Sequence, residues 1–212
     1  MTAPILILGA TSGIGASAVK EAKSRGLPVR AFARGADKLD ATDLVEPFPG
    51  DALEKDSVEA ALSGVRAVIY ALGIKERLSM LWEEETLFSE TTRVLIPAMN
   101  SANVKRLVVV TGFGAGRSKS AMSRIESLGH RAILGRPYAD KDRQEALVME
   151  SDLDWTIARP VILTNGSAAA PRVLREPNTW RNGLISRAAV ATYLLNAIEN
   201  ELDVRSDVVL VR

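Results

Sequence analysis

The feature that most constrains this chain is an apolar run that passes directly into three closely spaced glycines. Residues 5–8 read Ile-Leu-Ile-Leu, and Gly9, Gly13 and Gly15 follow with the spacing Gly-x-x-x-Gly-x-Gly. Four consecutive branched apolar residues are typical of a strand buried on both faces, as in a parallel sheet. Beyond the first two glycines, apolar residues recur at helical spacing: Ile14, Ala18, Val19 and Ala22. The pattern predicts a strand, a tight glycine turn and a helix in immediate succession.

A glycine turn between a buried strand and a helix is an arrangement that binds dinucleotides. Gly9 permits the tight turn, Gly13 lets the backbone approach a diphosphate, and Gly15 lets the helix pack closely on the strand. The first N–H groups of the helix have no intrahelical acceptor and carry partial positive charge, so they attract phosphate. We therefore expect a dinucleotide site here, whereas glycines alone would indicate only a turn.

The end of the second expected strand, residues 27–33, bears on which dinucleotide is bound. The residue that closes this strand meets the adenosine ribose, and an acidic side chain there would repel a 2′-phosphate. This chain has Arg34 at that position and Arg30 nearby, and the first acidic residue is Asp37. Because a guanidinium pairs with phosphate through two N–H groups, we expect NADP(H) in preference to NAD(H). The alternative is an ordinary solvated arginine at a strand end.

The remainder of the chain alternates between strand and helix patterns. The further expected strands are residues 45–49, 67–70, 106–110, 154–158 and 208–211, and the expected helices are 57–62, 85–102, 137–150 and a last one capped by Ser186. Pro97 lies inside one helical pattern and predicts a kink. This alternation indicates an α/β fold, a doubly wound Rossmann parallel sheet with helices on both faces, formed by residues 1–212 as a single domain.

Three segments show no clear pattern. Residues 74–85 are expected to form an irregular excursion, and residues 165–180 an excursion near the substrate. Residues 117–136 are polar and basic, and they are consistent either with a lid over the substrate site or with a partly disordered loop. We therefore place substrate-side loops at about 112–136 and 165–180. His130, the single histidine, is expected to be structural or exposed.

Composition excludes several functional classes. The formal charge is +1 and no run of Lys and Arg is clustered, so a nucleic-acid partner is not expected. No cysteine and one histidine rule out disulfides, thiolate nucleophiles and metal sites rich in these residues. No apolar run approaches the length of a membrane span, and no signal-peptide pattern is present. We expect a soluble, cytoplasmic protein with a small-molecule substrate, no metal and no membrane partner.

Positions after two other expected strands also bear on the dinucleotide. Asp51 could accept a hydrogen bond from an adenine amino group, or it could help to begin the next helix. The segment Ala71-Leu72-Gly73 follows residues 67–70, and its small residues let the backbone lie beside a cofactor.

Nearly the whole chain resembles the short-chain dehydrogenase/reductase superfamily. Residues 10–15, Ala-Thr-Ser-Gly-Ile-Gly, resemble the glycine signature of its standard members. The motif Lys141-x-x-x-Glu145, the segment Leu-Asp-Trp-Thr-Ile-Ala-Arg-Pro at 153–160 and Ile-Ser-Arg at 185–187 are similar to its small atypical branch. That branch includes NmrA-type regulators and biliverdin/flavin reductases of the B type.

The resemblance implies roles for individual residues. The residues that would line the cofactor are Thr11, Ser12, Ile14, Arg34, Asp51, Leu72 and Gly73. Thr111 would occupy the place of the catalytic serine or threonine, and Pro160 and Val161 would lie near the nicotinamide carboxamide. Lys141 would be the family lysine, which serves both the cofactor and catalysis.

One departure from the superfamily concerns the proton donor. Standard members place a catalytic tyrosine four residues before the lysine, which lowers the pKa of the phenol. Here Tyr138 precedes Lys141 by three residues, which changes its direction on a helix by about 100°. Tyr138 is then either a catalytic acid in an unusual geometry or, with Pro137 in the place of the tyrosine, no acid at all. Lys141 and Glu145 could instead be an ordinary exposed pair, although their order is the less favourable one for a helix.

The expected function is an NADPH-dependent oxidoreductase that reduces a small conjugated acceptor, such as a quinone or a flavin, or a carbonyl. The alternative is a non-catalytic NADP(H)-binding redox sensor of the NmrA type, which the missing tyrosine spacing favours. The sequence leaves the substrate and the oligomeric state open.

Overall fold

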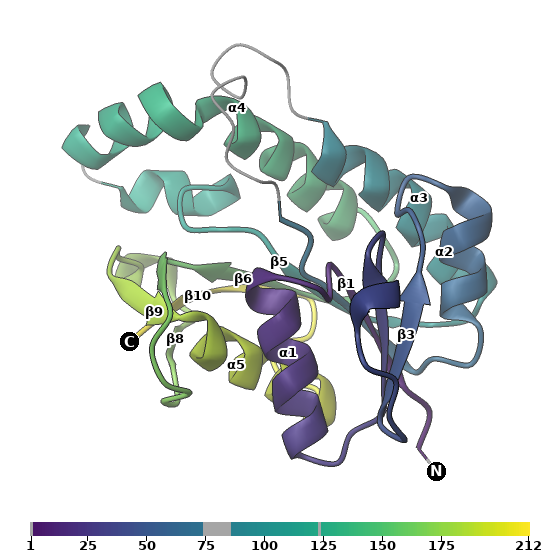
Figure 1. The fold of residues 1–212 in the computed structure, drawn as a ribbon. Coiled ribbons are helices and arrows are strands. Elements are labelled where there is room, and N and C mark those ends of the chain that lie inside the picture. Colours follow the sequence, from purple (N-terminus) through teal and green to yellow (C-terminus); the bar gives the residue numbers. More distant parts are fainter. Residues whose placement is uncertain (1, 74–85, 123) are drawn as a thin grey trace.

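The computed structural model describes residues 2–73, 86–122 and 124–212, and it has a sheet between two layers of helices (Figure 1). The strands are β1 Ile5–Leu8, β2 Val29–Ala33, β3 Val45–Pro49, β4 Ala67–Tyr70, β5 Arg106–Val110, β6 Asp154–Pro160, β7 Ile162–Thr164, β8 Arg172–Leu174, β9 Leu184–Ser186 and β10 Ser206–Val211. The helices are α1 Gly13–Ser24, α2 Lys55–Leu62, α3 Leu87–Ser101, α4 Arg124–Met149 and α5 Arg187–Glu199, with 3-10 turns η1 Ala36–Lys38, η3 Gly116–Ala121 and η4 Pro177–Thr179.

Eight strands form the main sheet in the order β3-β2-β1-β4-β5-β6-β10-β8. Every neighbouring pair is parallel except β10 and β8, and β7 pairs with β9 in a separate small sheet. The order reverses at β1, because the chain first builds outward to β3 and then crosses to β4 on the other side. Ligands of such sheets bind at the carboxyl ends of the strands beside this reversal, here β1 and β4.

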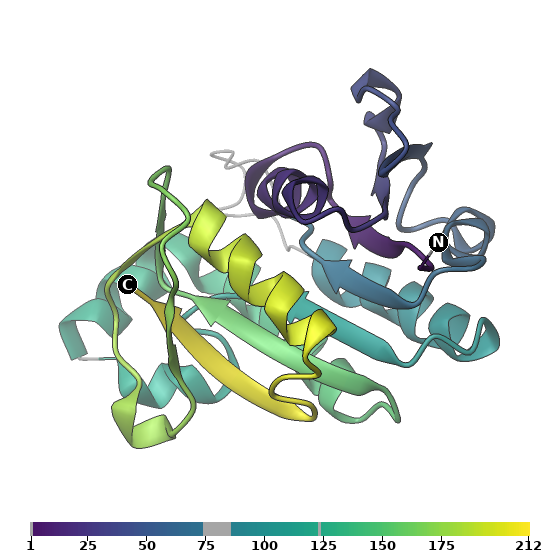
Figure 2. The same ribbon diagram turned by 90° about the horizontal axis from the view of Figure 1, so that it is seen from below.

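The strand β1 is buried on both faces, as its sequence predicts. Ile5 and Ile7 pack in a core with α1 and α5, whereas Leu6 and Leu8 pack in a second core with α2, α3 and Val148 of α4. Seen from below, α1 and α5 lie together on one face of the sheet (Figure 2). The predicted doubly wound fold with helices on both faces is therefore confirmed.

The start of α1 packs backbone to backbone against the ends of β1 and β4. A side-chain carbon at Gly9, which has φ +85°, would stand 2.6 Å from the carbonyl oxygen of Ala71. A carbon at Gly15 would overlap the carbonyl group of Gly9. Gly13 has φ +56° and no atom within 4 Å of its missing side chain, so it faces open space. The first and third glycines thus fix the packing, and the second leaves the backbone accessible.

The expectation of a loop over residues 117–136 is wrong, because most of this segment is helical. Residues 116–121 form η3, and α4 begins at Arg124 rather than at Pro137, which lies inside the helix. Proline is common at the first helical turn and unfavourable inside a helix, which is why the sequence suggests a start at Pro137. His130 lies in this part of α4, and its side chain is outside the described residues, as is the expected excursion at 74–85.

The segment 165–180 is also more ordered than its composition suggests. Its residues Arg172–Leu174 form β8, which pairs with β10 and extends the main sheet. Leu174 and Trp180 are buried, and the indole N–H of Trp180 donates to the Leu174 carbonyl at 3.0 Å. A strand of three residues among Pro, Asn and Ala is too short to show a periodic pattern. The expectation that this segment stands apart from the core is therefore wrong.

The helix ends and other boundaries differ little from expectation. The predicted cap of α5 is confirmed, because the Ser186 hydroxyl accepts from the Ala189 N–H at 3.0 Å. The helix α3 continues past Pro97, which is exposed. Across the described residues, no helix combines the length and apolar character needed to cross a membrane.

We expect Gly15→Ala to lower the free energy of unfolding by about 2 kcal/mol, because the added methyl group overlaps backbone that cannot move aside. Gly35→Ala is the matched control, since its new carbon would meet nothing within 4 Å, and its φ is −113°. Chemical denaturation of both variants measures the difference. Equal losses in the two would contradict the tight packing at Gly15.

Candidate functional site

The amino end of α1 presents unused hydrogen-bond donors. Among the described residues, no group accepts from the N–H groups of Gly13, Ile14 and Gly15, and the first bond is from Ala16 to the Ser12 carbonyl at 3.1 Å. The Ser12 side chain does not cap the helix, and the first turn has no acidic residue. Three free donors and the positive end of the helix dipole therefore face the ends of β1 and β4, which is a site for a diphosphate.

The two arginines of β2 and its end have different surroundings. Arg30 forms an ion pair with Glu46 at 2.8 Å and donates to the carbonyls of Ala61 and Ser63. Arg34 is exposed, and within the described part of the chain its side chain has no hydrogen bond or ion pair. Only Arg34 is thus available for an incoming anion, and Arg30 is committed to the fold.

Asp51 organises the turn after β3. One oxygen of its carboxylate accepts from the Leu53 N–H at 3.0 Å, and Glu54 is the N-cap residue that precedes α2. The carboxylate therefore supports the turn that leads into α2, close to the structural role considered from the sequence. A contact to adenine through the second oxygen stays a prediction.

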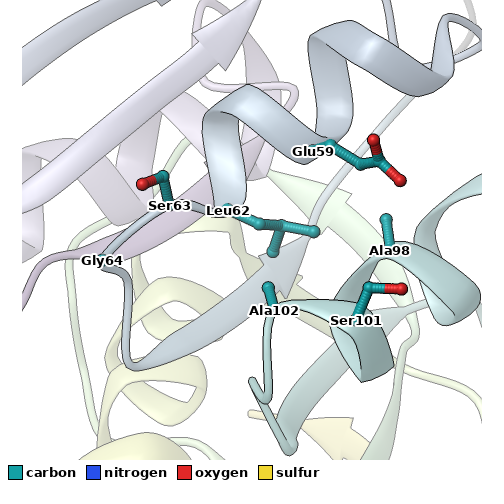
Figure 3. A pocket seen from close by; sticks show the side chains of 7 residues that line it. All are labelled: Glu59, Leu62, Ser63, Gly64, Ala98, Ser101 and Ala102. Atoms are coloured by element: carbon teal, nitrogen blue, oxygen red, sulfur yellow. The ribbon is translucent and has the colours of Figure 1, made fainter.

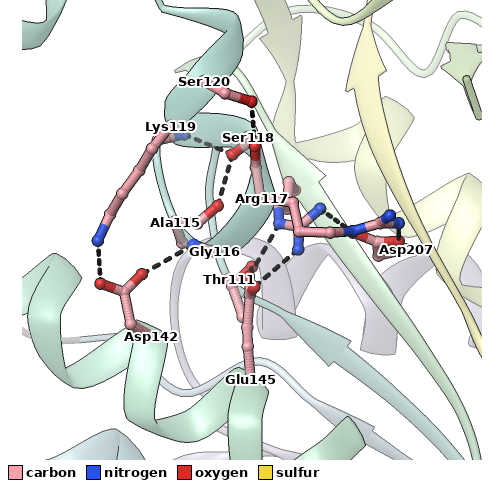
Figure 4. Close-up of polar contacts among 12 residues, drawn as sticks. Thr111, Ala115, Gly116, Arg117, Ser118, Lys119, Ser120, Asp142, Glu145 and Asp207 are labelled. Atoms are coloured by element: carbon pink, nitrogen blue, oxygen red, sulfur yellow. Dashed lines mark hydrogen bonds and ion pairs between the residues drawn. The ribbon is translucent and has the colours of Figure 1, made fainter. Parts of the chain in front are cut away.

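A second group of polar residues lies where β5 ends. The Thr111 hydroxyl donates to Glu145 Oε1 at 2.7 Å, and the ammonium of Lys141 donates to the Thr111 carbonyl at 2.6 Å. Thr111 is 3% exposed and Glu145 is 2% exposed. One residue of the strand end is thus held by two residues of α4, which are one helical turn apart (Figure 4 shows the bond to Glu145).

Arg159 of β6 joins this group to β10. The guanidinium is fully buried and donates to both oxygens of Glu145, at 2.9 Å and 2.7 Å, and to Asp207. Arg117 pairs with Asp207 from the outside, so two cations balance two carboxylates. Burial opposes charge on Asp207, but the bonds from Arg117 and Arg159 hold the pKa of its carboxyl below the usual value. Asp207 is therefore ionised at neutral pH.

The loop after β5 is fixed on this cluster, not free. Gly116 has φ +50°, and a side chain there would collide with the Glu145 carboxylate. Its N–H donates to Asp142 at 2.7 Å, and Lys119 pairs with the same carboxylate. Trp180 closes the outside, with its ring 5.5 Å from the guanidinium of Arg117 and 5.2 Å from that of Arg159. Bonds to Asp142 of α4 therefore hold the loop after β5 in place.

Lys141 is not the exposed partner of Glu145. Its ammonium lies 5.2 Å from the ring centre of Phe88 and 5.1 Å from that of Tyr138. Burial lowers the pKa of Lys141 to about 8, and the negative charge of Glu145 offsets only part of this. The interpretation of Lys141 and Glu145 as an exposed ion pair is therefore wrong, because Glu145 forms its ion pair with Arg159.

Tyr138 shares a helix face with Lys141, but the two do not form the arrangement of the standard members. The phenol oxygen would lie 2.6 Å from a side-chain carbon placed at Gly112, so it stands against the backbone of the loop. Burial, followed by the charge of Glu145, raises the pKa of Tyr138 to about 12. The ammonium faces the ring of Tyr138, and the phenol is a weaker acid than free tyrosine. Its predicted catalytic role stays untested.

The two parts of the site lie along one edge of the sheet. Phe113 N–H donates to the Pro160 carbonyl at 3.0 Å, so the loop after β5 runs beside the end of β6, and Val161 is buried next to it. Ala71, Leu72 and Gly73 follow β4, which lies between β1 and β5. The structure thus brings the predicted cofactor residues of β1 and β4 to the same edge as Thr111 and Lys141.

Sequence reasoning predicted no catalytic or cofactor-binding role for three residues of this site. Arg159 and Asp207 interrupt apolar strand patterns, and Glu145 lies one turn beyond Lys141. A charged residue within a buried strand requires a partner of opposite charge, so the sequence positions of Arg159 and Asp207 could have predicted a buried ion pair. Asp140 is similar: its buried carboxylate accepts from the Phe88 N–H at 2.7 Å and caps α3 from another helix.

A separate hollow lies between α2 and α3 (Figure 3). It is lined by Glu59, Leu62, Ser63, Gly64, Ala98, Ser101 and Ala102. These residues end the helices that lead into β4 and β5, so the hollow lies at the amino ends of these strands, opposite the carboxyl edge. In the described ranges, no cluster of His, Cys, Asp and Glu is suited to a metal ion.

We expect Glu145→Gln to lower the free energy of unfolding by about 3 kcal/mol, because it leaves Arg159 buried with one anion fewer. Glu59→Gln is the control, since Glu59 pairs with Lys55 at 3.6 Å on the surface and should change stability by less than about 1 kcal/mol. Urea denaturation compares the two. A loss at Glu145 no larger than at Glu59 would contradict the buried cluster.

Comparison with known proteins bears on this site. Residues 9–201 match the family described as NAD(P)H-binding. An NAD(P)H azoreductase from Xenophilus azovorans is 26% identical over 175 residues, which cover 81% of this chain and 52% of the relative. The protein YwnB of Bacillus subtilis (strain 168) is 34% identical over 112 residues, covering 51% of this chain and 47% of YwnB. The aligned regions thus take in about half the length of these two curated relatives.

Solved structures agree over nearly the full length. ChuY, described as an anaerobillin reductase from Escherichia coli O157:H7, superposes with a TM-score of 0.79 at 26% identity, covering 98% of this chain and 96% of ChuY. A wide-type short-chain dehydrogenase/reductase from Veillonella parvula in complex with NADP gives 0.74 at 16% identity, covering 100% and 95%, and supports the fold alone. The chain belongs to the NAD(P)H-binding family, whose model matches it from residue 9 to residue 201, and it has a Rossmann fold.

Proposed function

We propose that this protein is an NADPH-dependent reductase of a small conjugated acceptor such as a quinone or a flavin. The observation that carries the proposal is the set of free N–H groups on Gly13, Ile14 and Gly15, beside the reversal of strand order at β1 and β4. These donors and the open space at Gly13 fit a dinucleotide diphosphate. Reduced nicotinamide, when bound, supplies a hydride, and the protein binds and orients the reactants.

The preference for NADPH is proposed from Arg34. Its guanidinium follows β2, which is the strand whose end meets the adenosine ribose in this architecture. It is exposed and uncommitted within the described residues, whereas Arg30 is held by Glu46. A free guanidinium can form two parallel bonds with a 2′-phosphate, and no such gain exists for a ribose hydroxyl.

The class of acceptor is proposed from the weakness of the hydroxyl donors. The Thr111 hydroxyl already donates to Glu145, and burial raises the pKa of Tyr138. A simple carbonyl needs a well-placed acid when the hydride arrives, whereas a conjugated ring spreads the negative charge and accepts a proton from a weaker donor. The relative from Xenophilus azovorans is by name a reductase of azo groups, which are also unsaturated acceptors and not carbonyls.

The second candidate is a non-catalytic NADP(H)-binding sensor. The raised pKa of Tyr138 favours it, because the phenol of a catalytic tyrosine should be made more acidic. A steady-state assay of NADPH oxidation with quinones, flavins and aldehydes separates the candidates. Turnover with a quinone or a flavin supports the reductase, and tight NADPH binding without turnover of any acceptor supports the sensor.

We expect Arg34→Ala to raise the Kd for NADPH about tenfold, equivalent to about 1.4 kcal/mol, and to leave the Kd for NADH unchanged. Arg172→Ala is the matched control, because Arg172 is an exposed arginine on β8, at the other edge of the sheet from β3 and β2. Isothermal titration with each cofactor measures both constants. If the wild type binds NADPH and NADH equally, or if Arg34→Ala weakens both to the same extent, Arg34 does not read the 2′-phosphate.

A further inference from the structure

Three groups at the carboxyl end of β5 carry a proton that could complete a reduction. They are the hydroxyl of Thr111, the phenol of Tyr138 and the ammonium of Lys141. All three lie on the loop after β5 or on the part of α4 that packs against it. The identity of the proton donor determines how the turnover rate depends on pH and which acceptors can be reduced.

The Thr111 proton points away from the open edge. It is donated to Glu145 Oε1 at 2.7 Å, and the carboxylate is itself held by two bonds from Arg159. Because Glu145 and Arg159 are both buried and form an ion pair, this acceptor is fixed and charged. Turning the hydroxyl toward a ligand would leave the carboxylate with one bond fewer in a buried place, which is unfavourable.

The Tyr138 phenol is disfavoured for a different reason. Its oxygen lies against the backbone at Gly112, where the chain has no side chain to separate them. The ammonium of Lys141 faces the centre of the aromatic ring at 5.1 Å. Burial, followed by the charge of Glu145, raises the pKa of Tyr138 to about 12. At neutral pH such a group is a poor donor.

Within the described residues, one of the three N–H bonds of Lys141 is used, by the Thr111 carbonyl at 2.6 Å, and the rings of Phe88 and Tyr138 enclose the group without accepting strong bonds. Lys141 is half-buried as a residue, and burial of its ammonium is the main cause of its lowered pKa. Of the three groups, Thr111 donates its proton to a buried carboxylate and Tyr138 is a very weak acid. Neither limit applies to the ammonium of Lys141.

Among the described residues, Glu145 on the same helix is the charged group that acts on Lys141, and Arg159 of β6 pairs with that carboxylate. From α3 the contact is the ring of Phe88, and Asp140 is turned to the backbone of that helix.

The other nearby charges are engaged elsewhere or exposed. Asp142 pairs with Lys119 of the η3 loop, and Glu90 and Arg93 of α3 are exposed. Burial consequently lowers the pKa of Lys141 to about 8, which suits proton transfer near neutral pH.

We propose that Lys141 is the proton donor of this enzyme, in the place that the phenol takes in standard members of the superfamily. This rests on the proposed reductase function. The acceptor gains a hydride from NADPH and a proton from the ammonium, so that two electrons leave the cofactor and none leave the lysine. The neutral amine then takes a proton from water, and the sum is acceptor, NADPH and one proton giving reduced acceptor and NADP+.

The first test is the pH dependence of turnover with a quinone. The ammonium form is active, so kcat of the wild type falls as the pH rises through about 8. Lys141→Ala lowers kcat at least about 100-fold and loses this inflection. Tyr138→Phe removes the phenol but keeps the ring, and its profile keeps the same midpoint. Lys105→Ala, a lysine exposed at the opposite end of β5, is the matched control and leaves kcat unchanged.

Chemical rescue separates a donor from a merely structural lysine. Added methylammonium restores turnover of Lys141→Ala in proportion to the concentration of its protonated form, because the small cation fills the vacated place. A structural or purely cofactor-binding role gives no such dependence, and the variant would then show a raised KM for NADPH with little change in kcat.

A readout without cofactor tests the same group directly. Lysines of the cofactor-free protein are dimethylated with carbon-13 and followed by NMR, with Lys141→Ala assigning the signal. The expected midpoint is near 8, and the surface lysines titrate near 10.4. A midpoint for Lys141 at the surface value, or Lys141→Ala with the rate and pH profile of the wild type, overturns the proposal and leaves the reductase standing. Failure of the wild type to bind NADPH instead overturns the proposed function.

Discussion

The direct backbone contact at Gly9 and Gly15 is the constraint on which the cofactor site depends. Only glycine lets the start of α1 touch the ends of β1 and β4, and this contact directs the first N–H groups of the helix toward the crevice between these strands. Buried apolar residues on both faces of β1 hold that strand in the centre of the sheet. The donors are thus set before any ligand arrives.

The buried guanidinium of Arg159 fixes the other half of the site, at the end of β5, as the glycine contact fixes the cofactor half. It connects α4, β6 and β10 through Glu145 and Asp207, and Glu145 in turn fixes Thr111. Such a cluster is no strong source of stability in itself, since burying the charges is costly, but loss of one member leaves another charge without a partner. Its effect on the chemistry is to direct the Thr111 proton inward and to leave Lys141 as the charged group near the open edge.

The sequence predicted the fold well where local pattern and tertiary structure agree. A few adjacent residues determine each of the elements that were predicted correctly. These are the strand, glycine turn and helix at the amino terminus, the buried strand at residues 106–110 and the Ser186 cap. The errors lie elsewhere. The start of α4 was misplaced because Pro137 resembles a first-turn proline, and β8 was missed because three residues carry no period. The surroundings of Lys141 and Glu145 depend on Phe88 of α3 and Arg159 of β6, and helical spacing within α4 cannot reveal contacts with other elements.

The central claim is that a dinucleotide diphosphate binds the free N–H groups at the start of α1. The most direct measurement is a nitrogen-15 NMR titration of the protein with NADPH, with the amides of Gly13, Ile14 and Gly15 assigned. The account predicts that these three signals shift strongly and saturate together with the binding isotherm, while the signal of Gly64, at the amino-terminal edge of the sheet, stays in place. Binding of NADPH that leaves the three amides unmoved would contradict it.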